Sequence, residues 1–246
     1  MQNKYVGDFG DFGKYAMLKH LARTGLSLGI NWYLTPDEIY CNDGKHTAYL
    51  KNDRMQDYDS KIYRVLKELV CKQRRDVKEI ESSDILPPDT VYFSLPLDWA
   101  NAAKHNTRTE YRAAWHYQAM EAMNDRDLVF LDPDNGLQVK SVSLTGRKGN
   151  KYIGLNELHD YVSTGKSIVF YNHRERKKEA EYLQRFLRLH KEEAYIKTKL
   201  FGIKFSGGTV RDYIFLLHPE HKDKVLNACY ALLDSVWQSH FKLLDM

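Results

Sequence analysis

The apolar residues of this chain fall into two alternating patterns. Short apolar runs predict strands at 30–34, 91–95, 128–131, 167–171 and 212–217, with a further candidate at 196–201. Longer stretches with apolar residues at helical spacing predict helices at 15–26, 59–72, 109–123, 154–162, 174–189 and 220–233. Strands that alternate with helices of these lengths are typical of an α/β fold, with a mostly parallel sheet and helices on both faces.

Length and cysteine usage narrow the class of protein. The 246 residues fit a single domain over 1–246, with a helical insertion around 52–88. Three cysteines without a Cys-x-x-Cys pair, Cys41, Cys71 and Cys229, indicate reduced thiols in a cytoplasmic protein rather than disulfides or a zinc site. No run of about 18 apolar residues occurs, so no membrane partner is expected. The net charge of +4 is compatible with an RNA or DNA partner without indicating one by itself.

The segment from Asp127 to Gly136 carries the strongest candidate chemistry. The run 128–131 predicts a strand buried on both faces, and Pro133 must end it because proline cannot donate to a sheet ladder. Asp132, Asp134 and Asn135 then follow the carboxyl end of a central strand, where α/β sheets bind ligands. Asp, Pro, Asn and Gly also build ordinary turns. We favour a site because two carboxylates and an amide exceed what a turn needs.

The segment from Gly7 to Lys14 repeats Gly-Asp-Phe and runs into a helix. Glycines permit close backbone approach, and a helix N-terminus suits an anion, which Lys14 could also contact. The segment lacks the Gly-Lys-Ser/Thr ending of a phosphate-binding P-loop. A structured arm that places Phe9 and Phe12 in the core explains the same residues equally well.

A histidine follows the strand at 167–171 and lies at the same sheet edge as the Asp-Pro loop. His173 could act as a general base, or bind phosphate together with Arg174. A solvated histidine in a helix-capping loop is the alternative. The next helix is basic but contains glutamates, which usually means a solvated face, although its end at 185–191 could contact a nucleic-acid backbone.

The Asp132-Pro133 loop resembles the Asp-Pro-Pro-Tyr signature of class I S-adenosylmethionine-dependent amino methyltransferases that act on adenine. The order of further segments is most similar to the J-type ribosomal large-subunit RNA adenine methyltransferases. These segments are Gly7-x-x-x-Asp11-x-x-Lys14, Thr164-Gly165 and Ser206-Gly207-Gly208. The resemblance implies a bacterial-type protein with a Rossmann-like methyltransferase-type sheet. It also implies S-adenosylmethionine as cofactor and methylation of a base amino group in nucleic acid.

The same resemblance assigns residue roles. Asp132 and the Pro133 carbonyl would accept hydrogen bonds from the substrate amino group, while Asp134 and Asn135 replace the signature's second proline and aromatic residue. The expected catalytic set is Asp132, Pro133, Asp134, Asn135 and His173. The expected cofactor side is Gly7, Asp11, Lys14, Thr35, Asp37, Ser94 and Asp98. Thr35 to Glu38 stands where the family has a glycine-rich loop, and Ser94 or Asp98 stands for the acid that binds the ribose.

Two other functions fit the same residues. A Mg²⁺-dependent nuclease or nucleotide hydrolase would hold the metal through Asp132 and Asp134, with Asp37 or Glu38 assisting. A non-catalytic binding module with a degenerate methyltransferase fold would explain the altered glycine loop. The leading hypothesis assigns no metal ligands.

Overall fold

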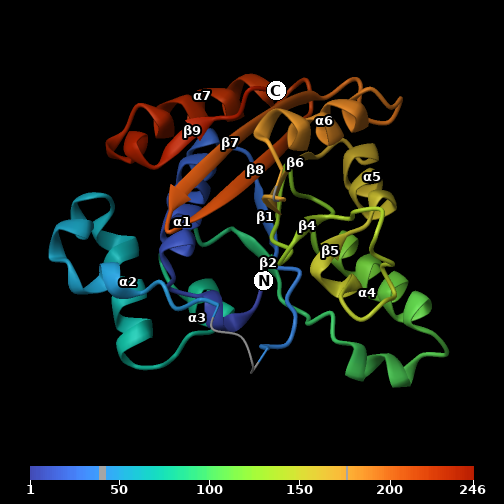
Figure 1. The fold of residues 1–246 in the computed structure, drawn as a ribbon, viewed down its shortest axis with the longest axis horizontal. Coiled ribbons are helices and arrows are strands. Elements are labelled where there is room, and N and C mark those ends of the chain that lie inside the picture. The colour runs from blue at the N-terminus through green and yellow to red at the C-terminus, as the bar shows by residue number, and fades with distance from the viewer. Residues whose placement is uncertain (39–42, 176) are drawn as a thin grey trace.

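A computed structural model describes residues 1–38, 43–175 and 177–246 (Figure 1). Cys41 lies outside the described residues. The strands are β1 (Leu28–Asn31), β2 (Val91–Phe93), β3 (Leu128–Leu131), β4 (Gly136–Leu137), β5 (Tyr152–Ile153), β6 (Ser167–His173), β7 (Lys199–Gly207), β8 (Thr209–Leu217) and β9 (Phe241–Leu243). The α-helices are α1 (Phe9–Leu21), α2 (Ser60–Cys71), α3 (Val77–Glu81), α4 (Arg108–Ala122), α5 (Leu155–Ser163), α6 (Glu179–His190) and α7 (Lys222–Leu233).

The central sheet has seven strands in the order β2-β1-β3-β6-β8-β7-β9. The pairs β1–β2, β1–β3 and β3–β6 are parallel, whereas β8 is antiparallel to both of its neighbours and β9 is antiparallel to β7. Five of these seven strands, β2, β1, β3, β6 and β7, therefore run in one direction. This arrangement confirms the predicted α/β Rossmann-like fold.

The register of the central strands brings the carboxyl ends of β1 and β3 to the same edge of the sheet as the end of β6. Asn31 of β1 is paired with Leu131 of β3, which is paired in turn with Phe170 of β6. Parallel strands in register end at the same edge, so the residues that follow β1 and β3 and those that end β6 meet there.

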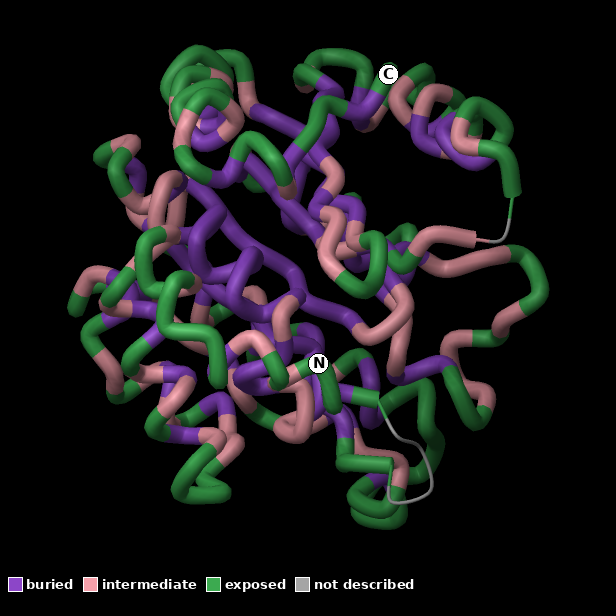
Figure 2. The backbone as a smooth tube through the Cα atoms, turned by 60° about the vertical axis from the view of Figure 1, so that its left-hand side comes forward, coloured by how far each residue is buried: buried purple, intermediate pink, exposed green. Residues whose placement is uncertain are grey.

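Strand β3 is buried on both faces, as its unbroken apolar run predicts. Leu128 and Phe130 belong to the core under α1, α2, α3 and α7, whereas Val129 and Leu131 belong to the core under α4, α5 and α6. Figure 1 shows α1 and α2 on one side of the sheet and α4 and α5 on the other. The buried strands run through the middle of the molecule in Figure 2.

Helix α1 begins at Phe9, six residues before the predicted start at Tyr15. The Asp8 side chain accepts a hydrogen bond from the Asp11 backbone N–H at 2.8 Å and so caps the helix. Two glycines inside the helix hid this start, because glycine is unfavourable in helix interiors.

Other predicted boundaries also needed correction. Helix α4 is capped by Thr107, not Thr109, in a capping box with Glu110. Strand β6 continues to His173, and α6 starts only at Glu179, because Arg174 lies against β8 with its guanidinium on the Asp212 carboxylate at 2.7 and 2.9 Å.

The segment 52–88, which lies between β1 and β2, contains α2, which matches the helix predicted at 59–72. It also contains two elements without a counterpart in the predicted list, α3 and a 3-10 helix, η4 (Asp53–Asp57). Strands β4 and β5 form a separate two-stranded sheet directly after the Asp-Pro loop. Among the described residues, none of the helices combines the length and the apolar character needed to cross a bilayer.

Candidate functional site

A cavity of about 310 Å³ opens at the sheet edge where β3 and β6 end and β8 begins. The N-terminal segment and the loop around Gly44 complete its wall. The lining residues are Met1, Tyr5, Asp8, Asp43, Gly44, His46, Asp132, Pro133, Asp134, Asn135, Tyr171, His173, Thr209, Val210 and Arg211. The residues of the expected catalytic set, from the Asp-Pro loop and from the end of β6, therefore share one cavity.

The Asp132 carboxylate forms an ion pair with a buried lysine, Lys14. Its Oδ2 atom lies 2.7 Å from Lys14 Nζ, which also lies 2.9 Å from Asp11 Oδ1. Burial lowers the pKa of Lys14, but the two carboxylates outweigh it and the net shift is upward. Lys14 therefore remains an ammonium. The described residues form no hydrogen bond to the other oxygen of Asp132, Oδ1, and Asp132 lines the cavity.

Arg211 ties the same group of charges to β8. Its guanidinium bonds both oxygens of Asp8, at 2.7 and 2.9 Å, and lies 3.4 Å from Asp11 Oδ1. Burial lowers the pKa of Arg211, but Asp8 and Asp11 raise it well above its ordinary value. Helix α1, β3 and β8 are thus joined by one chain of ion pairs beside the cavity.

The repeated glycines of α1 serve packing in the structure. A Cβ atom on Gly10 would lie 1.9 Å from Arg211 Cζ, and one on Gly13 would lie 2.3 Å from the Phe205 ring. The helix N-terminus is already occupied by the Asp8 carboxylate, and Phe12 is fully buried. These contacts favour the structured-arm interpretation of the segment over the anion-site interpretation.

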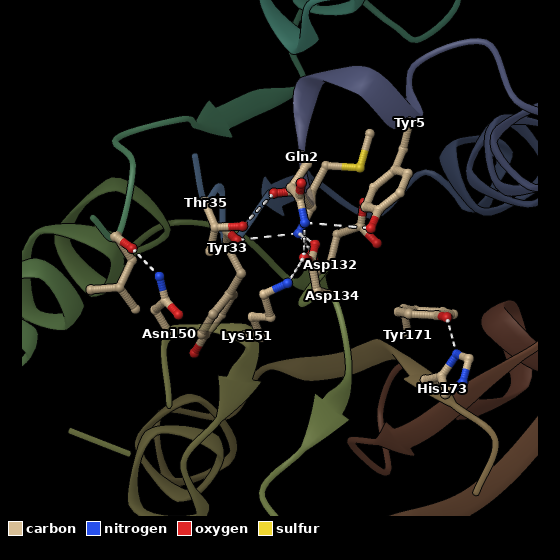
Figure 3. Close-up of polar contacts among 12 residues, drawn as sticks. Gln2, Tyr5, Tyr33, Thr35, Asp132, Asp134, Asn150, Lys151, Tyr171 and His173 are labelled. Carbon is tan, nitrogen blue, oxygen red and sulfur yellow. Dashed lines mark hydrogen bonds and ion pairs between the residues drawn. The ribbon is translucent and has the colours of Figure 1, made fainter. Parts of the chain in front are cut away.

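Asp134 differs from Asp132 in that cations and donors surround it (Figure 3). The α-ammonium of Met1 lies 2.8 Å from its Oδ1, and the Gln2 amide and Lys151 Nζ lie 2.5 and 3.5 Å from its Oδ2. Burial raises the pKa of Asp134, but these cations and hydrogen bonds outweigh it and the net shift is downward. Asp134 is an ionised anchor for the N-terminal segment.

The same Met1 ammonium also binds two strand ends. It donates to the Tyr33 carbonyl after β1 at 3.2 Å and to the Asp132 carbonyl after β3 at 2.7 Å. Tyr33 has a positive φ of 43°, so its backbone leaves the strand conformation and its carbonyl does not point where a strand carbonyl would. The ends of β1 and β3 therefore present a pair of carbonyls that suits an ammonium group.

Two tyrosines give the cavity an aromatic surface. Tyr5 and Tyr171 both line it, and Figure 3 shows them on the same side of Asp132 and Asp134. The Tyr171 hydroxyl lies 3.2 Å from His173 Nδ1, and Arg211 Cζ lies 5.9 Å from the Tyr171 ring centre. Burial raises the pKa of Tyr171, so its hydroxyl is neutral. The ring is held in place on two sides.

The expected cofactor residues contact different parts of the structure. Asp11 and Lys14 contact each other, and Lys14 contacts Asp132. Gly7 has a φ of 86° and precedes the α1 cap. Thr35 and Asp37 bind backbone atoms of the N-terminal segment: the Thr35 N–H donates to the Met1 carbonyl at 2.9 Å, and Asp37 accepts from the Lys4 N–H at 3.2 Å.

The remaining two expected cofactor residues lie beyond β2. Ser94 follows that strand directly, and Asp98 caps the 3-10 helix η5 (Trp99–Lys104) by accepting from the Ala100 N–H at 3.0 Å. Neither Ser94 nor Asp98 is among the cavity-lining residues. The two ribose-binding assignments therefore lie outside the described wall of the cavity that contains the catalytic set.

The metal hypothesis finds little support in the geometry. Within the described ranges, no three His, Cys, Asp or Glu side chains are placed to hold one metal ion. Asp132 is paired with Lys14, Asp134 with the Met1 ammonium, and Glu38 with Lys151 at 2.7 Å. A cation would have to displace these partners.

Sequence reasoning missed several residues of the cavity and its supports. They are Tyr5, Asp8, Lys151, Tyr171 and Arg211. Tyr171 ends a predicted strand at the same edge as the Asp-Pro loop, which is a usable signal. Arg211 carries none, because it is 203 residues from the Asp8 carboxylate that binds it.

No protein-family model matches this sequence, and a search of curated proteins gives no match either. Function is therefore inferred from the geometry and chemistry of the site itself.

Proposed function

We propose that the protein is a cytoplasmic S-adenosylmethionine-dependent methyltransferase-like protein that methylates an amino group of a base in RNA or DNA. The observation that supports this most is the state of Asp132. Lys14 holds one of its oxygens, the described residues form no hydrogen bond to the other, and Asp132 lines a cavity with Tyr5 and Tyr171 at the carboxyl edge of a Rossmann-like sheet.

An exocyclic amino group in this cavity would donate hydrogen bonds to Asp132 Oδ1 and to the Pro133 carbonyl. Both acceptors increase electron density on the amino nitrogen, which makes it a better nucleophile towards a methyl donor. Tyr5 and Tyr171 would stack against the planar base and supply the aromatic surface that Asn135 does not. His173, which lines the same wall, would accept the proton that the methylated amine loses.

The cofactor's aminoacyl end has a chemically suitable position. The Tyr33 and Asp132 carbonyls already bind an ammonium, that of Met1, and S-adenosylmethionine carries the same group. When bound, the cofactor would supply the methyl group, and the Met1 ammonium would have to leave these carbonyls.

The occupied carbonyls also support a second candidate, a non-catalytic binding module. If the Met1 ammonium stays in place, the cavity still offers Asp132 Oδ1 and two aromatic rings to a planar ligand. Such a protein would bind a base without a cofactor.

Calorimetric titration with S-adenosylmethionine and S-adenosylhomocysteine tests the proposal first. Micromolar binding, about −8 kcal/mol, is expected. Transfer of a labelled methyl group to total RNA and to DNA would then identify the acceptor. No heat and no thermal shift with either compound would reject methyl transfer and leave the binding module.

Substitution of Asp132 separates chemistry from folding. Asp132→Asn is expected to lower kcat on the order of 10²-fold or more, because the amide cannot act as an anionic acceptor. Lys14 would still be paired with Asp11, so the melting temperature should change little. Asp125→Asn is the matched control, because Asp125 is exposed, lies outside the cavity and should retain the activity. A large loss of folding in Asp132→Asn would reassign Asp132 to a structural role.

A further inference from the structure

We infer that Lys14 is a positioning residue for the acceptor site: it is the counter-ion of the Asp132 carboxylate and, by holding its Oδ2 atom, fixes the orientation of that carboxylate. This inference rests on the proposed function for the identity of the ligand. It departs from the sequence-based assignment of Lys14 to the cofactor.

The contacts of Lys14 show that it acts through Asp132. Its side chain is 1% exposed and is not among the cavity-lining residues. Its Nζ atom lies 2.7 Å from Asp132 Oδ2, 2.9 Å from Asp11 Oδ1 and 3.6 Å from the Met1 sulfur. An ammonium has three donors, so these three neighbours leave none for a ligand.

The surrounding charges make Asp132 dependent on this lysine. Around it, Tyr15 of α1 and Tyr213 of β8 are buried and Tyr171 of β6 is partly buried. All three are neutral, since burial raises the pKa of each. Arg211 is held by Asp8 and Asp11, and the Met1 ammonium, which donates to the Asp132 carbonyl, is paired with the Asp134 carboxylate. Within the described residues, Lys14 is therefore the cation that bonds the Asp132 carboxylate.

Loss of this ion pair would change the chemistry that the cavity presents. A buried carboxylate without a counter-ion takes up a proton, because burial disfavours the charged form. Protonated Asp132 would offer a hydroxyl donor to an amino group that is itself a donor. An amino group of a ligand would then face a second hydrogen-bond donor instead of an acceptor.

Carbon-13 NMR of labelled aspartate carboxyls measures this state without any ligand. The Asp132 resonance is assigned by its loss in Asp132→Asn. Its midpoint should lie about 2 pH units higher in Lys14→Met than in the wild type, because the variant lacks the counter-ion that lies 2.7 Å from Asp132 Oδ2. Lys14→Arg should restore much of the difference. Lys166→Met is the control, because it removes another buried lysine, one that donates to the Asn124 carbonyl at 2.6 Å.

A double variant keeps the inference testable if Lys14→Met fails to fold. Asp11→Asn/Lys14→Met removes one charge of each sign, so it leaves the net charge of the cluster unchanged, and it should show the same upward shift of the Asp132 midpoint. An unmoved midpoint in both Lys14→Met and the double variant would overturn the inference.

Kinetics then distinguish this inference from the proposed function. If the wild type transfers methyl groups, Lys14→Met should shift the acid limb of kcat to higher pH by about the same 2 units and change KM for the cofactor little. Methyl transfer with an unmoved Asp132 titration would reject the positioning role alone. A moved titration in a protein that transfers no methyl group would support the positioning role and reject the proposed chemistry.

Discussion

Gly10 shows how a residue without a side chain can organise a charged site. The guanidinium of Arg211 lies where a Cβ atom on Gly10 would be, at 1.9 to 2.3 Å from that position. Glycine inside a helix costs about 0.5–1 kcal/mol relative to alanine. The contact that Gly10 permits must therefore stabilise the protein by more than this cost. What it permits is direct contact between α1 and an arginine that binds Asp8 and Asp11.

Gly10→Ala is therefore expected to destabilise the protein by about 1–3 kcal/mol in urea unfolding, because the added methyl group displaces the guanidinium. In an open helix the same change stabilises by about 0.5–1 kcal/mol. A stabilisation of that size would contradict the packing role. In an Arg211→Ala background the clash is absent, so Gly10→Ala should there be neutral or favourable.

At this scale the sequence located one half of the site. Proline marks the strand end, so the sequence alone predicts that Asp132, Asp134 and Asn135 lie in a crevice at the carboxyl end of that strand. The supports of Asp132 could not be placed, because Lys14 is 118 residues away and pairing across such a distance leaves no local pattern. Ser94 and Asp98 were assigned by analogy of position and lie outside the cavity wall.

Among the elements, α4 depends on its first residues. Thr107 accepts from the Glu110 N–H and Glu110 accepts from the Thr107 N–H, both at 3.1 Å. Thr107→Ala should cost about 1 kcal/mol in urea unfolding, since it leaves a helix-end donor unsatisfied. Thr109→Ala is the control and should change stability by less than about 0.5 kcal/mol, as is usual for an exposed position. A larger loss of stability in Thr109→Ala than in Thr107→Ala would indicate that Thr109 is the cap.

The elements that the sequence predicted well are those buried on both faces. The strand at 128–131 was placed with its observed ends, because an unbroken apolar run has few other structures available. Strands β4 and β5 have two residues each and β9 has three, which is too short for any periodicity. The start of helix α1 is predicted too late because two of its first five residues are glycines.

On the scale of the whole molecule, one ion pair connects two helices and the loop behind the site. Arg112 of α4 bonds Glu157 of α5 at 2.6 and 2.8 Å and donates to the carbonyls of Leu144, Gly149 and Tyr152. Burial raises the pKa of Glu157, but Arg112 outweighs it and the net shift is downward. The pair thereby fixes the segment that carries Lys151 to the helical layer.

A carboxyl whose pKa is lower in the folded state stabilises the protein above its unfolded pKa, near 4.5 for Glu157, and loses this contribution as the pH falls below it. Glu157→Gln should therefore lower the free energy of unfolding at neutral pH by about 3 kcal/mol and flatten its decline in acid. Urea unfolding across this pH range measures both. Glu68→Gln, at an exposed pair with Lys72, should leave the acid decline nearly intact. An equal flattening in both variants would contradict the assignment to Glu157.

The ion pairs of α1 also set an order of events during synthesis. Asp8 emerges from the ribosome long before Arg211, which follows it by 203 residues, and α1 also packs against β7 and α7. Until those late segments appear, the charges of α1 have no guanidinium partner and its apolar face has little to cover it. Contacts this distant in sequence form slowly and only after release of most of the chain. A nascent chain that ends before β8 cannot complete the cavity, so a ligand of this site is bound only after β8 has been synthesised.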